Sequence, residues 1–231
     1  MRPLAPSFRN VAISLLLTAI CGVAPAQAQA PQPESKGQVK DQVSTITYTL
    51  DWQEAQPSHY RIKIDSTGHA AYESLPKADA EPDDMYKSEF VMSAELRERI
   101  FALAEKANNF DGNFDYTKRK IANTGKKTLE YADAGRHFQT SYNWSENPTI
   151  QELTDIFYGI SNTMESGNKL AFMKRFDKLG LPEQLQSMLE LRSEGHLLEL
   201  QTIIPLLQKI AEDGSLMNLA RQRARQLIQS Q

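Results

Sequence analysis

The sequence predicts an α+β fold, in which an antiparallel sheet of hairpins carries helices packed on one face and an all-α C-terminal helical subdomain follows. Three observations lead to this prediction. Apolar and polar residues alternate in several short segments, as in half-buried strands. Most of these segments follow one another across short turns, which favours hairpins over parallel pairing. Beyond about Ser166 the alternation gives way to helical spacing.

Residues 1–28 have the pattern of a cleavable secretory signal. Two arginines precede an apolar run from Val11 to Val23, and alternating alanines follow, with cleavage expected after Ala28. The run is shorter than the roughly 20 residues that span a bilayer, so no stable membrane insertion is expected after cleavage. Cys21 would suit a lipoprotein, but Ile20 stands where a small residue is needed. We therefore expect an exported bacterial protein, either periplasmic or extracellular.

Composition narrows the classes of function. The chain has 231 residues, a formal net charge of −3 and a single cysteine, which would leave with the signal. A mature chain without cysteine excludes disulfides and cysteine-ligated metals. Scattered charges of both signs argue against nucleic acid as a partner. Residues 29–42 are rich in Gln, Pro, Ser and Lys and are predicted to form a disordered leader.

Four strands open an α+β domain that is predicted to span residues 43–165. Alternation places them at Val43–Trp52, His59–Asp65, His69–Ser74 and Tyr86–Met92. Between the second and third strands the chain must turn sharply, and Gly68 is the residue that can adopt the positive φ of such a turn.

The rest of this domain combines helices with a second hairpin. Ser93 is expected to cap a helix that runs to about Ala107. Strands follow at Lys127–Ala132 and Arg136–Trp144. Asn147-Pro148 then starts a long helix, because a capping side chain precedes a proline at the first helical position.

Residues 166–231 are predicted to form the helical subdomain, whose short loops favour antiparallel packing. One helix starts at Leu181 and is ended by Gly195. A further piece spans Leu197–Ala211, which Pro205 either kinks or restarts. Ser215 is predicted to cap the last helix.

No catalytic, cofactor or metal motif stands out. None of the four histidines is spaced from another as a helical metal pair would be. The acidic run over 111–115 lacks the later glycine and glutamate of a calcium loop. No G-x-S-x-G elbow occurs, and Gly125-Lys126-Lys127-Thr128 lacks the context of a phosphate-binding loop. The sequence therefore assigns no catalytic residue, no cofactor and no metal ligand.

The candidate ligand or partner surface consists of five residues: Trp52, Tyr142, Trp144, Arg221 and Arg225. Tyr142 and Trp144 stand between a strand end and a helix start. They suit the rim of a ligand site, or a structural corner in which Trp144 packs under the helix. The two arginines belong to a basic C-terminal helix that suits contact with a protein.

Several segments share a layout with known sequences. They are the hairpin from Tyr60 to Tyr72, the helix after Ser93, the Asn109-Phe110…Asp115-Tyr116 loop and Thr128-Leu129-Glu130-Tyr131. Their order resembles an exported bacterial family built on a domain of unknown function, over most of Val43–Ile228. The resemblance implies the same succession of hairpin, helix, loop and hairpin, and it implies no activity, so it transfers no functional residue.

The missing catalytic constellation and the helical C-terminus favour a non-catalytic, exported protein-interaction module that binds an envelope protein through its C-terminal helices. Two alternatives stay open. A cell-envelope hydrolase would need a cleft that joins carboxylates with a histidine distant in sequence. A small-ligand or polysaccharide-binding protein would show an exposed aromatic platform that includes Trp52 or Trp144.

Overall fold

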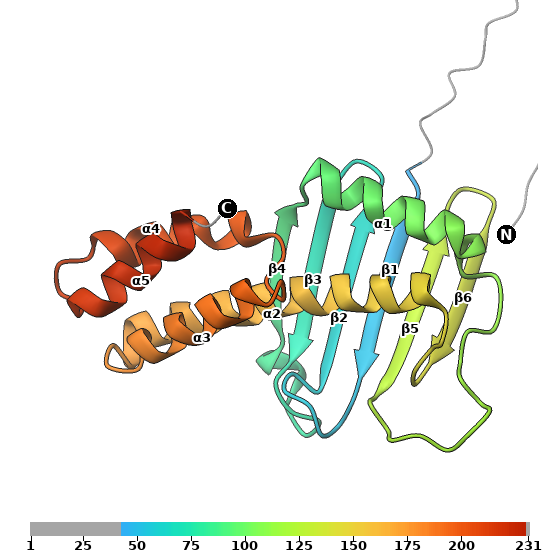
Figure 1. The fold of residues 1–231 in the computed structure, drawn as a ribbon, viewed down its shortest axis with the longest axis horizontal. Coiled ribbons are helices and arrows are strands. Elements are labelled where there is room, and N and C mark those ends of the chain that lie inside the picture. The colour runs from blue at the N-terminus through green and yellow to red at the C-terminus, as the bar shows by residue number, and fades with distance from the viewer. Residues whose placement is uncertain (1–42, 230–231) are drawn as a thin grey trace, which may run out of the picture. The chain divides into compact units, whose positions relative to one another are not determined.

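A single antiparallel sheet organises the first part of the chain. The computed structural model describes residues 43–229, so the predicted signal and leader, residues 1–42, lie outside the described residues. The strands are β1 (Thr45–Asp51), β2 (His59–Asp65), β3 (His69–Leu75), β4 (Tyr86–Val91), β5 (Lys126–Ala132) and β6 (His137–Tyr142). They pair in the order β4-β3-β2-β1-β5-β6, and each pair is antiparallel (Figure 1). The predicted α+β fold with an antiparallel sheet is confirmed.

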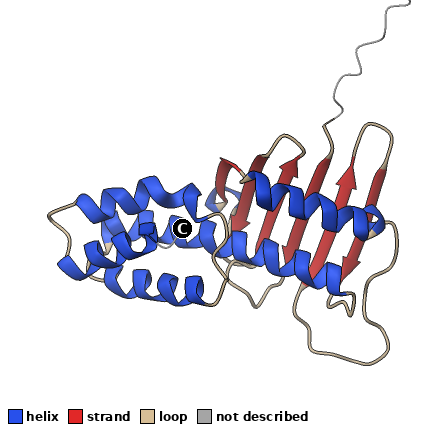
Figure 2. Cartoon of the chain, turned by 45° about the horizontal axis from the view of Figure 1, so that its top comes forward, coloured by secondary structure: helices blue, strands red, loops and turns tan. Residues whose placement is uncertain are grey.

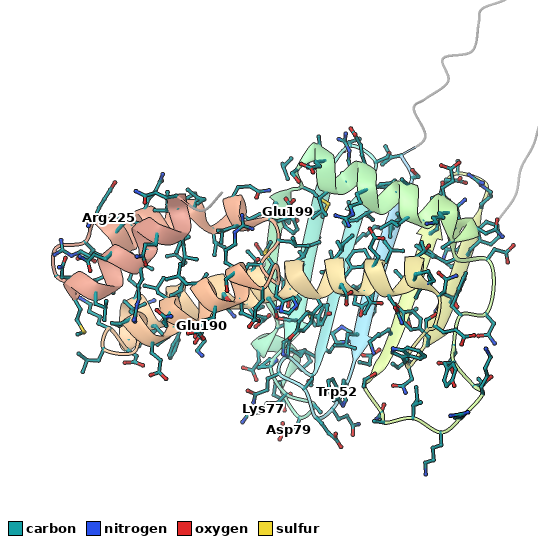
Figure 3. All side chains as sticks on the ribbon, in the orientation of Figure 1. Trp52, Lys77, Asp79, Glu190, Glu199 and Arg225 are labelled. Atoms are coloured by element: carbon teal, nitrogen blue, oxygen red, sulfur yellow. The ribbon has the colours of Figure 1, made fainter. Side chains whose placement is uncertain are left out.

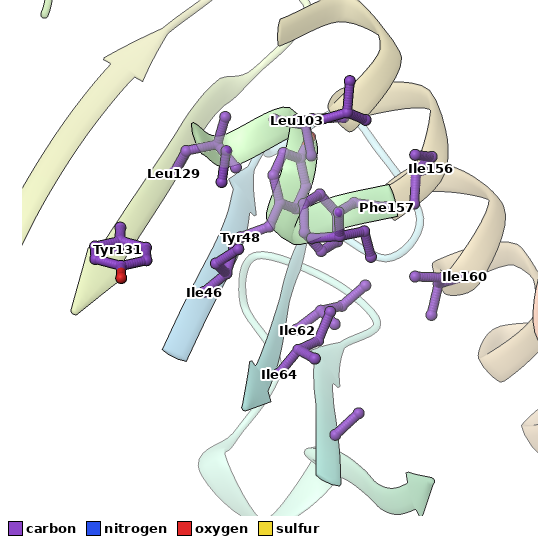
Figure 4. Packing of buried hydrophobic residues seen from close by; sticks show 14 of the residues in the cluster. Ile46, Tyr48, Ile62, Ile64, Leu103, Leu129, Tyr131, Ile156, Phe157 and Ile160 are labelled. Atoms are coloured by element: carbon purple, nitrogen blue, oxygen red, sulfur yellow. The ribbon is translucent and has the colours of Figure 1, made fainter. Parts of the chain in front are cut away.

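The two faces of the sheet differ as the alternation predicts. Helices α1 (Ala94–Lys106) and α2 (Pro148–Phe176) both cover one face, where Ile46 and Ile62 are fully buried (Figures 1 and 2). Figure 4 shows Tyr48 of β1 beneath Phe157 of α2, with the two rings stacked at 4.8 Å between centroids. The opposite face carries exposed charged residues such as Lys63. Burial of the helix-facing side chains is the main stabilising contribution to this half of the molecule.

Both helices on the sheet start at the predicted caps. The Ser93 hydroxyl accepts a hydrogen bond from the Leu96 amide at 3.4 Å, and the Asn147 carboxamide accepts from the amides of Thr149 and Ile150. These bonds satisfy amides that the first helical turn leaves without partners.

The second hairpin is shorter than predicted. β6 ends at Tyr142, whereas the alternation extends the strand to Trp144. Beyond Tyr142 the backbone leaves β5 and bonds the preceding loop instead. The Asn143 amide donates to the Asp115 carboxylate at 2.9 Å, and the Trp144 carbonyl accepts from the Tyr116 amide at 2.9 Å.

Three further helices form the C-terminal part, which confirms the predicted helical region. They are α3 (Leu181–Ser193), α4 (Ile204–Glu212) and α5 (Asn218–Gln229), and 3₁₀ turns occupy Pro82–Asp84, Asn108–Phe110 and Leu200–Ile203. Gly195 follows α3 with a φ of 78°, as a C-terminal glycine should. Pro205 begins α4 rather than kinking a longer helix. The expected Ser215 cap is wrong, because α5 starts at Asn218 and Ser215 instead donates to the Asp213 carboxylate.

α2 continues through the predicted domain boundary at residues 165 and 166. It is one helix of 29 residues, so the two parts share a rigid element rather than a linker. The buried apolar residues nevertheless divide into two clusters, one ending at Met164 and the other beginning at Leu170. None of the helices within residues 43–229 combines the length and apolar character that crossing a membrane requires.

A buried carboxylate fastens the helical part to the sheet. Glu199 is only 7% exposed and accepts hydrogen bonds from the Ser93 amide at 2.9 Å and the Ser93 hydroxyl at 2.5 Å (Figure 3). Next to it, the Leu198 amide donates to the Gly159 carbonyl of α2 at 3.2 Å. A Cβ on Gly159 would lie 2.9 Å from Leu198, so glycine permits this close approach.

Candidate functional site

Two of the predicted surface residues meet in a pocket beside the ends of β5 and β6, which we call the strand-end pocket. Its volume is about 310 Å³. The lining residues are Lys127, Tyr142, Asn143, Trp144, Ser145, Gln151, Thr154 and Asp155. The pocket lies where the chain turns from the end of β6 at Tyr142 into the start of α2 at Pro148. The Gln151 amide closes this turn by donating to the Ser145 carbonyl at 2.8 Å.

Lys127 forms the inner wall of the strand-end pocket. Its Nζ donates to the Thr124 carbonyl at 2.8 Å, the Thr124 hydroxyl at 3.0 Å and the Asn143 carbonyl at 2.8 Å. Three acceptors match the three protons of the ammonium group. Burial lowers the pKa of Lys127 to about 8. The side chain therefore fastens the loop before β5 to the strand end, and this role accounts for all its donors.

The two aromatic residues of the pocket have different roles. Tyr142 is 3% exposed and its hydroxyl lies 2.7 Å from the Thr154 hydroxyl, which itself donates to the Ile150 carbonyl. Burial raises the pKa of Tyr142. Trp144 is 41% exposed, and its ring meets the edge of Tyr116 at 5.1 Å between centroids. Tyr142 thus belongs to the packing under α2, whereas Trp144 presents an aromatic surface at the pocket mouth.

Asp155 gives the strand-end pocket its free polar group. This exposed carboxylate makes no hydrogen bond or ion pair with any described residue. A carboxylate beside an exposed indole suits a small ligand that donates hydrogen bonds from hydroxyl groups. Sequence reasoning did not select Asp155 or Lys127, because neither lies in a recognisable motif. Both come to line the pocket only because the hairpin packs against α2.

Trp52 lies behind the loop that Lys127 fastens. Its ring packs against the core of the sheet, and its indole N–H is buried without a hydrogen-bond partner among the described residues. The backbone at Gly125 passes so close that a Cβ there would lie 2.5 Å from the Trp52 Cβ. Trp52 is therefore partly buried against the sheet, in contrast to the exposed Trp144.

The two predicted arginines lie in the helical part, apart from the strand-end pocket. Arg225 of α5 donates to the Ala211 carbonyl at the end of α4 at 3.0 Å (Figure 3). Arg221 donates to the Asn218 side chain at 3.4 Å. Arg223, which sequence reasoning did not select, donates to the Pro182 carbonyl at 2.7 Å. The bonds of Arg223 and Arg225 join α5 to its neighbours, whereas the bond of Arg221 stays within α5.

A hydrolytic site receives little support from the histidines. His59 Nδ1 lies 2.7 Å from an Asp51 oxygen, an arrangement that orients the ring of a general base. No hydroxyl or thiol among residues 43–229 is hydrogen-bonded to that ring. On the open sheet face a depression of about 610 Å³ includes His69, Asp65 and Glu89. Asp65 there accepts from the Thr67 and His69 amides of its own turn.

Metal ligation likewise lacks a donor set in this part of the chain. Residues 43–229 contain no group of three or more histidine, cysteine, aspartate or glutamate side chains placed to hold an ion.

A cluster of exposed apolar side chains lies where α2 and α4 end. Phe176 is 64% exposed, Leu179 80%, Met217 48% and Leu219 44%, and we call these four residues the distal cluster. Leu179 and Met217 lie in the connections α2–α3 and α4–α5, Phe176 ends α2 and Leu219 lies in the first turn of α5. The two connections are hydrogen-bonded to each other. Lys178 Nζ lies 3.2 Å from the Ser215 hydroxyl, and Lys174 Nζ lies 3.0 Å from the Asp213 carboxylate.

The distal cluster lies at the end of the helical part remote from the sheet. α3 leaves this end and returns to Leu198 and Glu199, whose hydrogen bonds fasten the opposite end to α2 and α1. The sequence carries no clear signal for the cluster, because Leu170, Met173 and Phe176 follow one helical spacing although only Phe176 of the three is exposed.

No protein-family model matches the chain, and no curated protein matches it either. Function is therefore inferred from the geometry of the described residues.

Proposed function

We propose that the protein is a non-catalytic, exported interaction module, which binds a protein partner of the cell envelope through the distal cluster. The observation that carries this proposal is the gathering of exposed apolar residues. Of the ten large apolar side chains that are exposed among the described residues, four belong to the distal cluster and a fifth, Phe172, contacts Phe176 at 5.0 Å between ring centroids. Exposed apolar groups that gather in one place mark interaction surfaces more often than scattered ones do.

The chemistry around the cluster favours a protein as the partner. Arg175 lies over the Phe176 ring at 5.0 Å, and aromatic and arginine side chains are enriched where interfaces gain most of their binding energy. Charges of both signs surround the apolar residues, since Asp177, Lys178 and Glu212 are exposed there. A partner that fits would present apolar side chains with a mixed polar rim.

Point variants test this proposal better than truncation. A chain that stops near Glu165 would cut α2 within one continuous helix and would also remove Glu199, which accepts hydrogen bonds from Ser93. The double variant Phe176→Ser with Leu179→Ser removes exposed apolar area and disturbs no core contact. Val91→Ser is the matched control, because Val91 is 67% exposed on the edge strand β4.

The measurement is affinity capture from cell-envelope extract, followed by binding of the purified captured protein to each variant. We expect the unaltered chain and Val91→Ser to bind it equally. The double variant should lose about 2 kcal/mol or more of binding free energy, about thirtyfold in Kd. Equal affinity for all three proteins would place the interface elsewhere, and the absence of any captured protein would count against a stable envelope partner.

A second function is supported by a separate observation, the exposure of Trp144 beside the strand-end pocket. Exposed indole and a free carboxylate suit a saccharide or another small hydroxylated ligand. This alternative is tested by adding a disaccharide such as cellobiose to the protein while its indole fluorescence is recorded. The variant Trp144→Phe is the control that shows whether the signal comes from Trp144. A saturable change that Asp155→Asn abolishes would favour it, and no change in the unaltered chain would remove its main support.

A further inference from the structure

A second carboxylate in this molecule lies in a groove of about 510 Å³ beside α2, which we call the α2 groove. The groove is bounded by α2, α3 and the loops that follow β1 and β3. Residues that line it include Gln56 and Pro57 of the first loop, Glu165 and Phe172 of α2, and Gln184 of α3. It therefore lies where the sheet and the helical part meet, a common position for ligand sites.

Glu165 is the polar centre of the α2 groove. One of its oxygens accepts from the Tyr72 hydroxyl at 2.7 Å and from the Ser74 hydroxyl at 2.6 Å, both donors reaching up from β3. These two bonds hold the carboxylate in one position. The second oxygen accepts no hydrogen bond from a described residue, so it remains available to a ligand in the groove.

The charge of Glu165 has no partner within the described part of the chain. No lysine, arginine or histidine nitrogen of residues 43–229 forms an ion pair with it. Lys169 follows one helical turn later and also lines the groove, at a spacing that often gives an ion pair on a helix surface. The hydrogen bonds from Tyr72 and Ser74 direct the Glu165 side chain towards the sheet, and it forms no ion pair with Lys169. A half-buried carboxylate without a counter-charge favours binding of a cationic group.

The rest of the α2 groove matches a peptide. The amide side chains of Gln56, Asn168 and Gln184 make no hydrogen bonds among the described residues, and an amide offers the donors and the acceptor that a peptide backbone requires. Phe172, which is 60% exposed, and Pro57 add apolar surface for aliphatic side chains.

We infer that the α2 groove binds an extended peptide segment that carries a lysine or arginine side chain, with its cationic group on the free oxygen of Glu165. This site adjoins the distal cluster through Phe172, which contacts Phe176, but its polar centre Glu165 is not part of that cluster. Its failure would leave the proposed envelope interaction untouched, and a lost distal interaction would leave the groove intact.

The test uses the intact chain and four probes, titrated by NMR while the side-chain amide signals of Asn168 and Gln184 are followed. The probes are N-acetylated, C-amidated Ala-Lys-Ala, Ala-Glu-Ala and Ala-Gln-Ala, together with butylamine. We expect saturable shifts with Ala-Lys-Ala at a Kd of about 1 mM, the range of weak single-site contacts. Ala-Glu-Ala and Ala-Gln-Ala should bind at least about tenfold more weakly.

Glu165→Gln separates the charge from the fold. Glutamine keeps an oxygen that accepts from Tyr72 and Ser74, so the variant should unfold at nearly the same temperature, while its affinity for Ala-Lys-Ala falls at least about tenfold. Glu105→Gln, at an exposed position on α1, is the matched control and should bind as the unaltered chain does.

Three outcomes would overturn the inference. One is the absence of saturation with Ala-Lys-Ala, and another is equal binding by Glu165→Gln. The third is equal affinity for butylamine, which would mean that the groove recognises a free amine rather than a peptide.

Discussion

Removal of the Glu199 carboxylate should loosen the helical part from the sheet. Glu199 connects the two through a pair of bonds from Ser93, and the Gln201 side chain approaches the same carboxylate at 2.5 Å. The residue also holds a left-handed backbone conformation, with a φ of 58°. In Glu199→Ala the amide of Ser93 loses its acceptor in a place that water barely reaches.

The magnitude follows from these contacts. A hydrogen bond to a charged group contributes about 1.5–3 kcal/mol, and two such bonds are lost with partial compensation by water. We expect Glu199→Ala to lower the free energy of unfolding by about 3 kcal/mol, which for a chain of this size lowers Tm by about 6–12 °C. Glu199→Gly loses the same bonds but relieves the left-handed strain, so it should be about 1 kcal/mol more stable than the alanine variant.

Urea unfolding, monitored by circular dichroism, measures these differences in the free energy of unfolding. The comparison requires that the variants share the same dependence of this free energy on urea concentration. A double-mutant cycle with Ser93→Ala isolates the contact and should give a coupling energy of about 1.5–3 kcal/mol. Amide exchange adds a local probe, because the Ser93 amide should lose its protection in Glu199→Ala. If that variant lies within about 1 kcal/mol of the unaltered chain, or if the two substitutions are additive within about 0.5 kcal/mol, Glu199 does not fasten the two parts.

Three further outcomes are expected. Gly125→Ala should destabilise the fold by about 2–4 kcal/mol in urea unfolding, because it combines left-handed strain with an overlap on Trp52; Gly135→Ala, where nothing lies within 4 Å, should change little. Lys127 has a folded pKa of about 8 against about 10.4 unfolded, so the unfolded chain binds more protons between these values and Tm should rise with pH there, a rise that Lys127→Met should flatten. Burial raises the pKa of Tyr72 far above its usual value near pH 10, so the unfolded chain releases this proton first and stability should fall above about pH 10. Exposed Tyr158 should ionise in the folded chain, whereas the tyrosinate absorbance of Tyr72 should appear only as the fold is lost.

The order of strands and helices could be predicted because it depends on local pattern. Tyr60, Ile62 and Ile64 alternate with charged residues and all lie on the helix-covered face, and Asn147 caps α2 where its side chain and the following proline indicate. The same reasoning placed Ser215 wrongly at a helix start. Serine suits a tight turn as well as a cap, and here the neighbouring Asp213 carboxylate bonds its amide and hydroxyl.

The candidate sites depended on contacts that no local pattern reveals. Trp144 could be selected from its place between a strand and a helix, but its 41% exposure follows from the loop that bonds Asn143 and the Trp144 carbonyl. Glu165 lies on a helix among polar neighbours and is typical of a solvated surface residue in the sequence. Tyr72 and Ser74 share a face by strand alternation, and only the packing of α2 on that face converts Glu165 into a fixed and unpaired carboxylate.

Glu165 and Glu199 differ in how far the fold itself satisfies their carboxylates. Each carboxylate accepts two hydrogen bonds across the boundary between the sheet and the helical part. At Glu199 those donors, with Gln201, bond both carboxylate oxygens, and the residue is 7% exposed. Both oxygens of Glu199 therefore have their hydrogen-bond partners inside the fold. At Glu165 the donors use one oxygen and leave the other facing a groove. The third bond at Glu199 therefore separates the two carboxylates, and their capacity to bind a ligand depends on how many lone pairs the fold itself satisfies.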